Sequence, residues 1–252
     1  MNEKTISRRS LLKLASASTV TAAAVLPSAA RAAQAVQWDE TYEIIVVGAG
    51  GAGMAAAVKA AQKGAKHVVV LEKLNFPGGN TLISQGFINA ADPVRQPKQG
   101  IKDSWQHHAE QTLEAGDFRG QKDRVDVLCR NAYPTIEWLE SLGMQFKPKV
   151  IQIFGALYPR SHVPALPKGQ GYGTVLSKAA KELGVEVRTG MGVEEIIREK
   201  PFEGDVLGVV AKNAKGEIKR IRATRGVVLA AGGFSANKYL RELHDPRVAG
   251  LG

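Results

Sequence analysis

The sequence has almost no sulfur chemistry, because Cys129 is the only cysteine among 252 residues. A single thiol cannot form a disulfide within the chain, an iron–sulfur cluster or a zinc ribbon. The motif C-x-x-C-H is absent as well, so the sequence attaches no c-type haem. Cys129 lies in an apolar helical stretch, where we expect a buried, unreactive thiol. We therefore expect no metal centre in this chain.

Runs of like charge are also missing: no five consecutive residues share one sign, although the formal net charge is +10. Residues 1–32 hold five basic residues and one acidic residue, which leaves 29 basic against 23 acidic residues in the rest of the chain. A scattered excess of this kind argues against nucleic acid as a partner. It favours a mild positive field that attracts small anionic substrates or an acidic electron donor.

No apolar run is long enough to span a bilayer, which takes about 20 residues. The longest, from Leu14 to Leu26, follows the segment S-R-R-S-L-L-K at 7–13 and precedes Ala30-Arg31-Ala32. The first segment is typical of twin-arginine export, and the small residues suit signal peptidase. We predict a signal peptide at 1–32, a linker at 33–40 and a periplasmic protein, rather than a stable membrane anchor or an amphipathic N-terminal helix.

The twin-arginine route exports proteins that are already folded. A protein that acquires a non-covalent cofactor in the cytoplasm and works outside it needs this route. Export therefore predicts a tightly held cofactor and argues against NAD, which exchanges freely.

A strand, a glycine turn and a helix follow the linker. Residues 41–47 are typical of a buried strand, and G-A-G-G-A-G follows at 48–53. An alanine-rich helix is predicted at 54–63 and a second buried strand at 67–71. Glu72 stands at the end of that strand, 19 residues after Gly53. This arrangement is the dinucleotide-binding fingerprint in its expected context.

Each residue type in this fingerprint has a physical role. Gly48 permits the tight turn, Gly50 lets the backbone approach a pyrophosphate, and Gly53 lets helix and strand pack closely. The helix start offers free N–H groups and the positive end of a dipole to phosphates. Glu72 can accept hydrogen bonds from a ribose diol. The alternative is a glycine-rich turn without a ligand.

Two further segments carry a family resemblance. Residues 77–90, P-G-G-N-T-L-I-S-Q-G-F-I-N-A, and residues 225–234, R-G-V-V-L-A-A-G-G-F, resemble segments of the fumarate reductase and succinate dehydrogenase flavoprotein family, and the periplasmic flavocytochrome c type in particular. The resemblance implies that the second segment returns beside the first strand, and that the cofactor is FAD. The predicted FAD-binding residues are Gly48, Gly50, Gly51, Ala52, Gly53, Glu72, Lys73, Gly79, Asn80, Thr81, Gln85, Gly86, Val193, Ala231, Gly232 and Gly233.

Three positions depart from the family pattern. Asn80 stands where membrane-bound members carry a histidine bonded to the flavin, which implies non-covalent FAD. Phe87 replaces a second glycine, and Ala231 replaces a threonine of the pattern L-A-T-G-G-F.

The fold class expected from these motifs is α/β: a Rossmann-like FAD-binding domain of the glutathione-reductase type at 41–252, with a β-hairpin or small-sheet insertion. Helices are predicted at 103–115, 124–141 and 174–183, strands at 185–188 and 192–197, and a hairpin at 206–211 and 218–223. His107 and His108 point to different helix faces, cannot chelate one metal together, and are expected to be solvated.

The resemblance also bears on function. Arg160 and His162, in an R-S-H segment, are weak candidates for the substrate side, and an ordinary exposed loop fits them equally well. The family's capping domain and catalytic residues are expected beyond residue 252, so the domain is expected to be incomplete at its C-terminus. The resemblance implies FAD-dependent reduction of an α,β-unsaturated acid such as fumarate, urocanate or acrylate, with electrons from a separate cytochrome. The alternatives are a flavoenzyme of the ketosteroid dehydrogenase type and a non-catalytic FAD-binding fragment.

Overall fold

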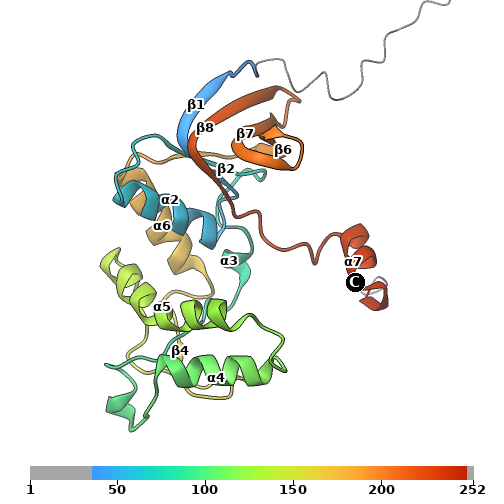
Figure 1. The fold of residues 1–252 in the computed structure, drawn as a ribbon. Coiled ribbons are helices and arrows are strands. Elements are labelled where there is room, and N and C mark those ends of the chain that lie inside the picture. The colour runs from blue at the N-terminus through green and yellow to red at the C-terminus, as the bar shows by residue number, and fades with distance from the viewer. Residues whose placement is uncertain (1–35, 249–252) are drawn as a thin grey trace, which may run out of the picture. The chain divides into compact units, whose positions relative to one another are not determined.

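The computed structural model describes residues 36–248, and the compact unit that contains the fold begins at Gln37 (Figure 1). The predicted signal peptide at 1–32 lies outside the described residues.

One six-stranded sheet organises this unit, with the strand order β5-β2-β1-β8-β7-β6. Strands β5, β2, β1 and β8 run parallel, whereas β8, β7 and β6 form an antiparallel meander continuous with them. The predicted hairpin therefore extends the main sheet. The bounds are β1 Glu40–Val47, β2 Val68–Leu71, β5 Glu186–Arg188, β6 Met191–Lys200, β7 Glu203–Asn213 and β8 Ile218–Leu229.

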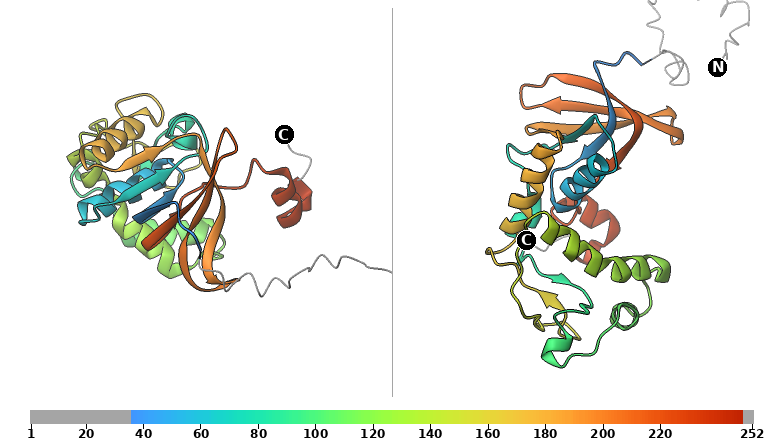
Figure 2. Two further views of the ribbon diagram at one scale, coloured as in Figure 1. Left: turned by 90° about the horizontal axis from the view of Figure 1, so that it is seen from above. Right: turned by 90° about the vertical axis from the view of Figure 1, so that its left-hand side faces the viewer.

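Strand β1 contributes side chains to the apolar clusters on both faces of the sheet, because successive side chains of a strand point to opposite faces. Val46 packs with helices α2 (Gly51–Gln62) and α6 (Gln170–Glu182), which lie together on one face of the sheet (Figure 1). Ile45 and Val47 pack on the other face with residues of β6, β7 and β8, the strands that form the upper layer in the right-hand view of Figure 2.

Residues 88–165 build a second region below the sheet in Figure 1. The short strands β3 (Ile88–Asn89) and β4 (Ser161–His162) pair antiparallel, and helices α4 (Trp105–Ala115) and α5 (Lys122–Ser141) pack against each other. Their apolar contacts include Ala90, Ala132 and Ile136, all buried. The remaining elements are α3 Gly79–Ile83, α7 Lys238–His244 and 3-10 turns at Pro97–Gln99 and Pro246–Val248.

Several expectations about elements are confirmed. Cys129 is buried in α5, and burial raises the pKa of its thiol. The predicted starts of α2 and α6, at 54 and 174, are wrong, because these helices begin at Gly51 and Gln170. Glycine is a poor helix former, so the glycines in both first turns hid the helix starts in the sequence. Within residues 36–248, no helix combines the length and apolarity needed to cross a membrane.

Candidate nucleotide-binding site

The glycine turn after β1 is closely packed against the end of β8. Gly48 has φ +98°, and a Cβ there would lie 2.5 Å from the carbonyl oxygen of Ala230. A Cβ at Gly53 would lie only 1.9 Å from the carbonyl oxygen of Gly48. Both positions therefore require glycine, one for the turn and one for the approach of helix to strand, as the fingerprint predicts.

Gly50 is different, because a Cβ at this position would meet no atom within 4 Å. Its backbone faces open space at the start of α2. The first-turn N–H groups, including those of Ala52 and Gly53, have no acceptor within the helix. An anion bound beside Gly50 would meet these groups and the positive end of the helix dipole.

One amide of this helix start already has a partner. The Gly51 N–H donates to the hydroxyl of Thr81, a residue of α3, at 3.0 Å. Gly78 pairs with Gly50 in a short parallel bridge and donates its N–H to the Ala49 carbonyl at 2.8 Å. The 77–81 segment thus closes over the glycine turn, and Gly79 lies directly beside Gly50.

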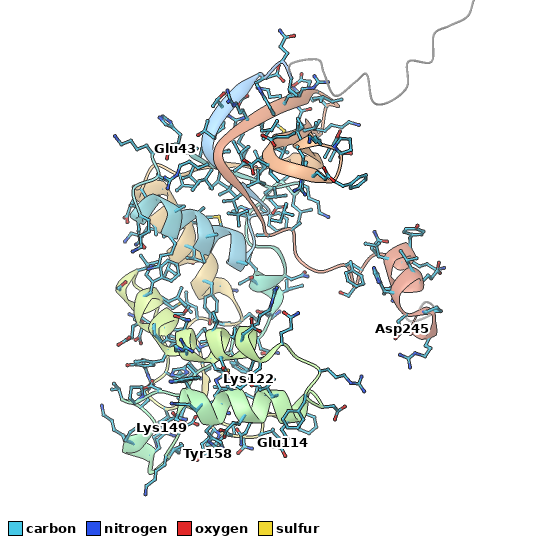
Figure 3. The ribbon with its side chains drawn as sticks, in the orientation of Figure 1. Glu43, Glu114, Lys122, Lys149, Tyr158 and Asp245 are labelled. Atoms are coloured by element: carbon cyan, nitrogen blue, oxygen red, sulfur yellow. The ribbon has the colours of Figure 1, made fainter. Side chains whose placement is uncertain are left out.

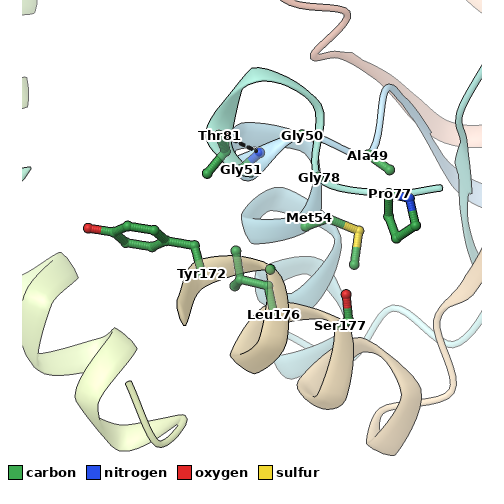
Figure 4. Close-up of a pocket in the computed structure, with 11 residues that line it drawn as sticks. Ala49, Gly50, Gly51, Met54, Pro77, Gly78, Thr81, Tyr172, Leu176 and Ser177 are labelled. Carbon is green, nitrogen blue, oxygen red and sulfur yellow. Dashed lines mark hydrogen bonds between the residues drawn. The ribbon is translucent and has the colours of Figure 1, made fainter. Parts of the chain in front are cut away.

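Figure 4 shows the cavity that these contacts leave, with the Gly51–Thr81 hydrogen bond drawn as a dashed line. Met54 and Leu176 provide its apolar walls, from α2 and α6. Its volume is about 10 Å³, enough for roughly one water molecule. A dinucleotide must therefore lie along the open side of the turn at Gly50.

Glu72 is buried at the end of β2, with 6% of its surface exposed. One carboxylate oxygen accepts the Ala49 N–H at 2.8 Å, and the other accepts the Leu74 N–H at 2.9 Å. The side chain thus ties the glycine turn to the end of β2. Each oxygen keeps a second lone pair, with which a ribose hydroxyl could pair.

The other predicted contacts lie around this turn. Gly86 is buried against Lys168 and Gly169, and its carbonyl accepts the Tyr172 hydroxyl at 2.6 Å. The side chains of Lys73, Asn80 and Gln85 are exposed. Val193 is half-buried on β6, and the N–H of Met191 at the start of this strand donates to the Glu72 carbonyl at 2.8 Å.

The second glycine motif follows β8, which lies parallel to β1 as the resemblance implies. The Ala230 N–H donates to the Val47 carbonyl at 2.9 Å, so this segment leaves the sheet beside the first turn. Ala231, Gly232 and Gly233 are exposed there, with open space at both glycines. Both glycine motifs therefore border the same open side.

The parallel strands, the glycine turn at the start of a helix and the buried acid after the second strand define a dinucleotide-binding domain. Residues 43–250 match the family described as FAD binding domain, and the chain belongs to this family. The open space at Gly50 and the free first-turn amides fit the pyrophosphate of FAD.

Two curated relatives have known reactions. The chain is 37% identical to the urocanate reductase of Eggerthella lenta, over 82% of this chain and 34% of that protein. It is 30% identical to the acrylate reductase flavoprotein subunit of Shewanella woodyi, over 97% of this chain and 50% of that protein. The chain thus spans about half, or less, of the length of these relatives.

Solved structures agree with the fold. A flavocytochrome c3 fumarate reductase in an open conformation superposes with a TM-score of 0.78 at 31% identity, covering 88% of this chain and 39% of that chain. The 3-ketosteroid dehydrogenase of Rhodococcus jostii gives 0.74 at 29% identity, covering 86% and 51%.

The weak candidates Arg160 and His162 lie away from the glycine turn, in the β3–β4 region. They are buried, with 4% and 0% of their surfaces exposed, so the alternative of an ordinary exposed loop is wrong. Arg160 forms a two-bond ion pair with Asp103 at 2.7 and 2.9 Å. His162 Nε2 lies 2.9 Å from Asp92, and its Nδ1 faces the carbonyls of Ile88 and Arg160.

Sequence reasoning missed the two acids in these pairs. Burial alone would raise the pKa of Asp92, but hydrogen bonds from His162 and Arg95 outweigh it and hold that pKa below its ordinary value. The pKa of Asp103 is lowered in the same way, mainly by Arg160. Each acid lies dozens of residues from its partner, so no local pattern could reveal the pairing.

The expectation of two solvated histidines is wrong for His108. Its Nδ1 is buried and has no hydrogen-bond partner within residues 36–248. Burial, together with the positive charge of Arg160, lowers the pKa of His108 to about 4. His107 is partly exposed; its Nδ1 lies 3.2 Å from Asp103 and its ring packs edge-on against Tyr158.

Proposed function

We propose that this chain is the FAD-binding part of a reductase for α,β-unsaturated carboxylic acids such as fumarate, acrylate or urocanate. The observation that carries the proposal is the open helix start at Gly50, bordered by Glu72 and both glycine motifs, in a chain that resembles acrylate and urocanate reductases over most of its length. Bound FAD would supply the hydride-transfer chemistry.

The residues of this chain would bind and orient the cofactor. The α2 start would take the pyrophosphate, and Glu72 would hold the adenosine ribose. Asn80 offers an amide where a covalent linkage would need a histidine or another nucleophile, so we propose non-covalent FAD. We propose that the residues that bind the substrate and donate a proton lie in a part of the protein that corresponds to the unmatched portion of the relatives.

Cofactor binding is tested by refolding the purified chain with FAD and NAD together. We expect a flavin spectrum that remains after gel filtration and is lost to the supernatant after acid precipitation, because no covalent bond holds the flavin. Uptake of NAD with no uptake of FAD would overturn the proposal. Flavin that stays with the acid precipitate would overturn the non-covalent part alone.

Turnover is tested separately, by oxidation of reduced viologen with fumarate, acrylate or urocanate. For these 252 residues alone we expect only the background rate. A robust rate would place the catalytic residues within this chain and would leave the FAD assignment intact.

A second candidate is a flavin dehydrogenase of the ketosteroid type. The likeness to the Rhodococcus jostii enzyme, with a TM-score of 0.74 at 29% identity, favours it. Curated relatives that reduce unsaturated acids favour the first candidate. Difference spectra of the FAD-loaded chain distinguish the two: a steroid-induced change in the flavin bands, with none from the unsaturated acids, would favour the second.

We further propose export through the twin-arginine pathway and a c-type cytochrome as electron donor in the periplasm. The R-R motif at 8–9 supports the first proposal, and the likeness to a flavocytochrome supports the second. Replacing both arginines by lysine should retain the protein in the cytoplasm, as fractionation and immunoblotting would show. Periplasmic accumulation of the double variant would contradict the pathway.

A further inference from the structure

A larger cavity, of about 220 Å³, lies in the β3–β4 region and shares no residue with the cavity beside the glycine turn. Drug-sized ligands need roughly 300–1,000 Å³, so this volume suits a small metabolite. Its polar lining comes from β3, α4 and the segment before β4: Asn89, His108, Gln111, Thr112, Tyr158 and Arg160. Tyr158 is labelled beside α4 in Figure 3.

Arg160 is the fixed cation of this cavity. Three of its five N–H groups are used, two by Asp103 and one by the Gln111 carbonyl oxygen at 2.7 Å. The Tyr158 ring lies 4.9 Å from the guanidinium carbon and covers one face of it. Among the residues that the structure describes, the other two N–H groups of the guanidinium have no acceptor.

Two amide side chains line the same cavity. Gln111 uses its oxygen to accept from Arg160, and Asn89 uses its oxygen to accept the Ser161 hydroxyl at 2.5 Å. Within residues 36–248, neither NH₂ group has an acceptor, whereas each can donate two hydrogen bonds. The contacts that fix both oxygens thus leave only donors free.

His108 adds an unsatisfied nitrogen. The ring is neutral at pH 7 because its pKa is lowered to about 4, so one nitrogen carries a proton and the other does not. The charged or titratable groups that influence the pKa of His108 are Arg160, Asp103 and His107. An Nδ1–H that donates to a ligand would satisfy the one buried ring nitrogen that lacks a partner among the described residues.

We propose that this cavity binds a small carboxylate through Arg160 and the amides of Asn89 and Gln111. An ionised carboxylate only accepts hydrogen bonds, which matches the unused N–H groups of Arg160, Asn89 and Gln111. No carboxylate of the described residues lines the cavity, so a cation would find no opposite charge there. The inference does not rest on the proposed reductase function, because neither FAD nor turnover enters its test.

The test uses the FAD-free folded chain, titrated with acetate and with acrylate and observed by NMR of the histidine rings. We expect saturable shifts of the His108 signals, with Nδ1 becoming the protonated nitrogen. Gln111→Glu keeps an acceptor for Arg160, removes the donor amide and adds a repelling charge. It should weaken binding at least about tenfold.

Gln106→Glu is the matched control, since it makes the same charge change at an exposed position of the same helix. It should bind as the wild type does. His108→Phe keeps an aromatic ring, removes Nδ1 and should also weaken binding. This variant is measured by carboxylate-dependent thermal stabilisation, and it replaces Gln111→Glu if that variant does not fold. No saturable effect in the wild type, or equal binding by Gln111→Glu and Gln106→Glu, would overturn the proposal.

Discussion

The position of single backbone atoms determines which glycines of the turn can be replaced by a larger residue. Gly53 and Gly50 are three residues apart, yet a Cβ would meet a carbonyl oxygen at 1.9 Å in one case and nothing within 4 Å in the other. One glycine is therefore needed for the fold and the other for access to the turn.

Exchanging each glycine for alanine separates these roles. Gly53→Ala should lower the free energy of unfolding by about 3 kcal/mol, because overpacking against backbone forces a shift. Gly50→Ala should change it by about 1 kcal/mol or less, yet weaken FAD binding at least about tenfold by filling the approach to the pyrophosphate. Urea denaturation and flavin fluorescence titration measure the two effects. A Gly50→Ala protein that binds FAD normally would contradict the assignment.

Glu72 acts at the same scale, through its two backbone hydrogen bonds. In Glu72→Gln one acceptor becomes a donor that faces another N–H, so the unfolding free energy should fall by about 1–3 kcal/mol. Glu194→Gln, at an exposed position on β6, provides the control and should have little effect. Equal urea midpoints for the two variants would show that Glu72 does not hold the turn.

At the scale of elements, two buried carboxylates join the segments around β3 and β4. Asp92 forms a hydrogen bond with His162 and an ion pair with Arg95, and Asp103 forms an ion pair with Arg160. A carboxyl whose folded pKa lies below its unfolded value stabilises the fold above the unfolded value, here 3.8, and loses this effect as the pH falls through the folded pKa.

Acid should therefore loosen this region. We expect the melting temperature to fall steeply below about pH 4. Asp92→Asn should cost about 1–3 kcal/mol at pH 7, because His162 and Arg95 lose a carboxylate oxygen as hydrogen-bond partner. The difference from the wild type should shrink at strongly acidic pH, where Asp92 itself becomes protonated. A pH-independent difference in melting temperature would exclude this role of the Asp92 charge.

For the whole molecule, the sequence predicts the parallel strands and the glycine turn, but it does not predict the buried polar pairs around β3 and β4. The strand, turn and helix at 41–63 and the return of β8 beside β1 follow from periodicity and glycine motifs, which are local signals. The pairs Asp92–His162 and Asp103–Arg160 join residues 70 and 57 apart. The R-S-H segment draws attention to Arg160 and His162, but neither acid has a periodic or motif signal, so the burial and pairing emerge only when β3 and β4 meet. The cavity at His108 was missed for the same reason.

The hydrogen bond between Thr81 and Gly51 affects how strongly the start of α2 can bind an anion. Its hydroxyl already satisfies the Gly51 amide, so an anion that took this amide would exchange one hydrogen bond for another. Such an exchange adds little to affinity, because the number of bonds at that nitrogen is unchanged. The gain on anion binding must come from neighbouring amides of the first turn. Thr81→Ala removes the hydroxyl that now accepts the Gly51 N–H, so it should tighten anion binding at this amide.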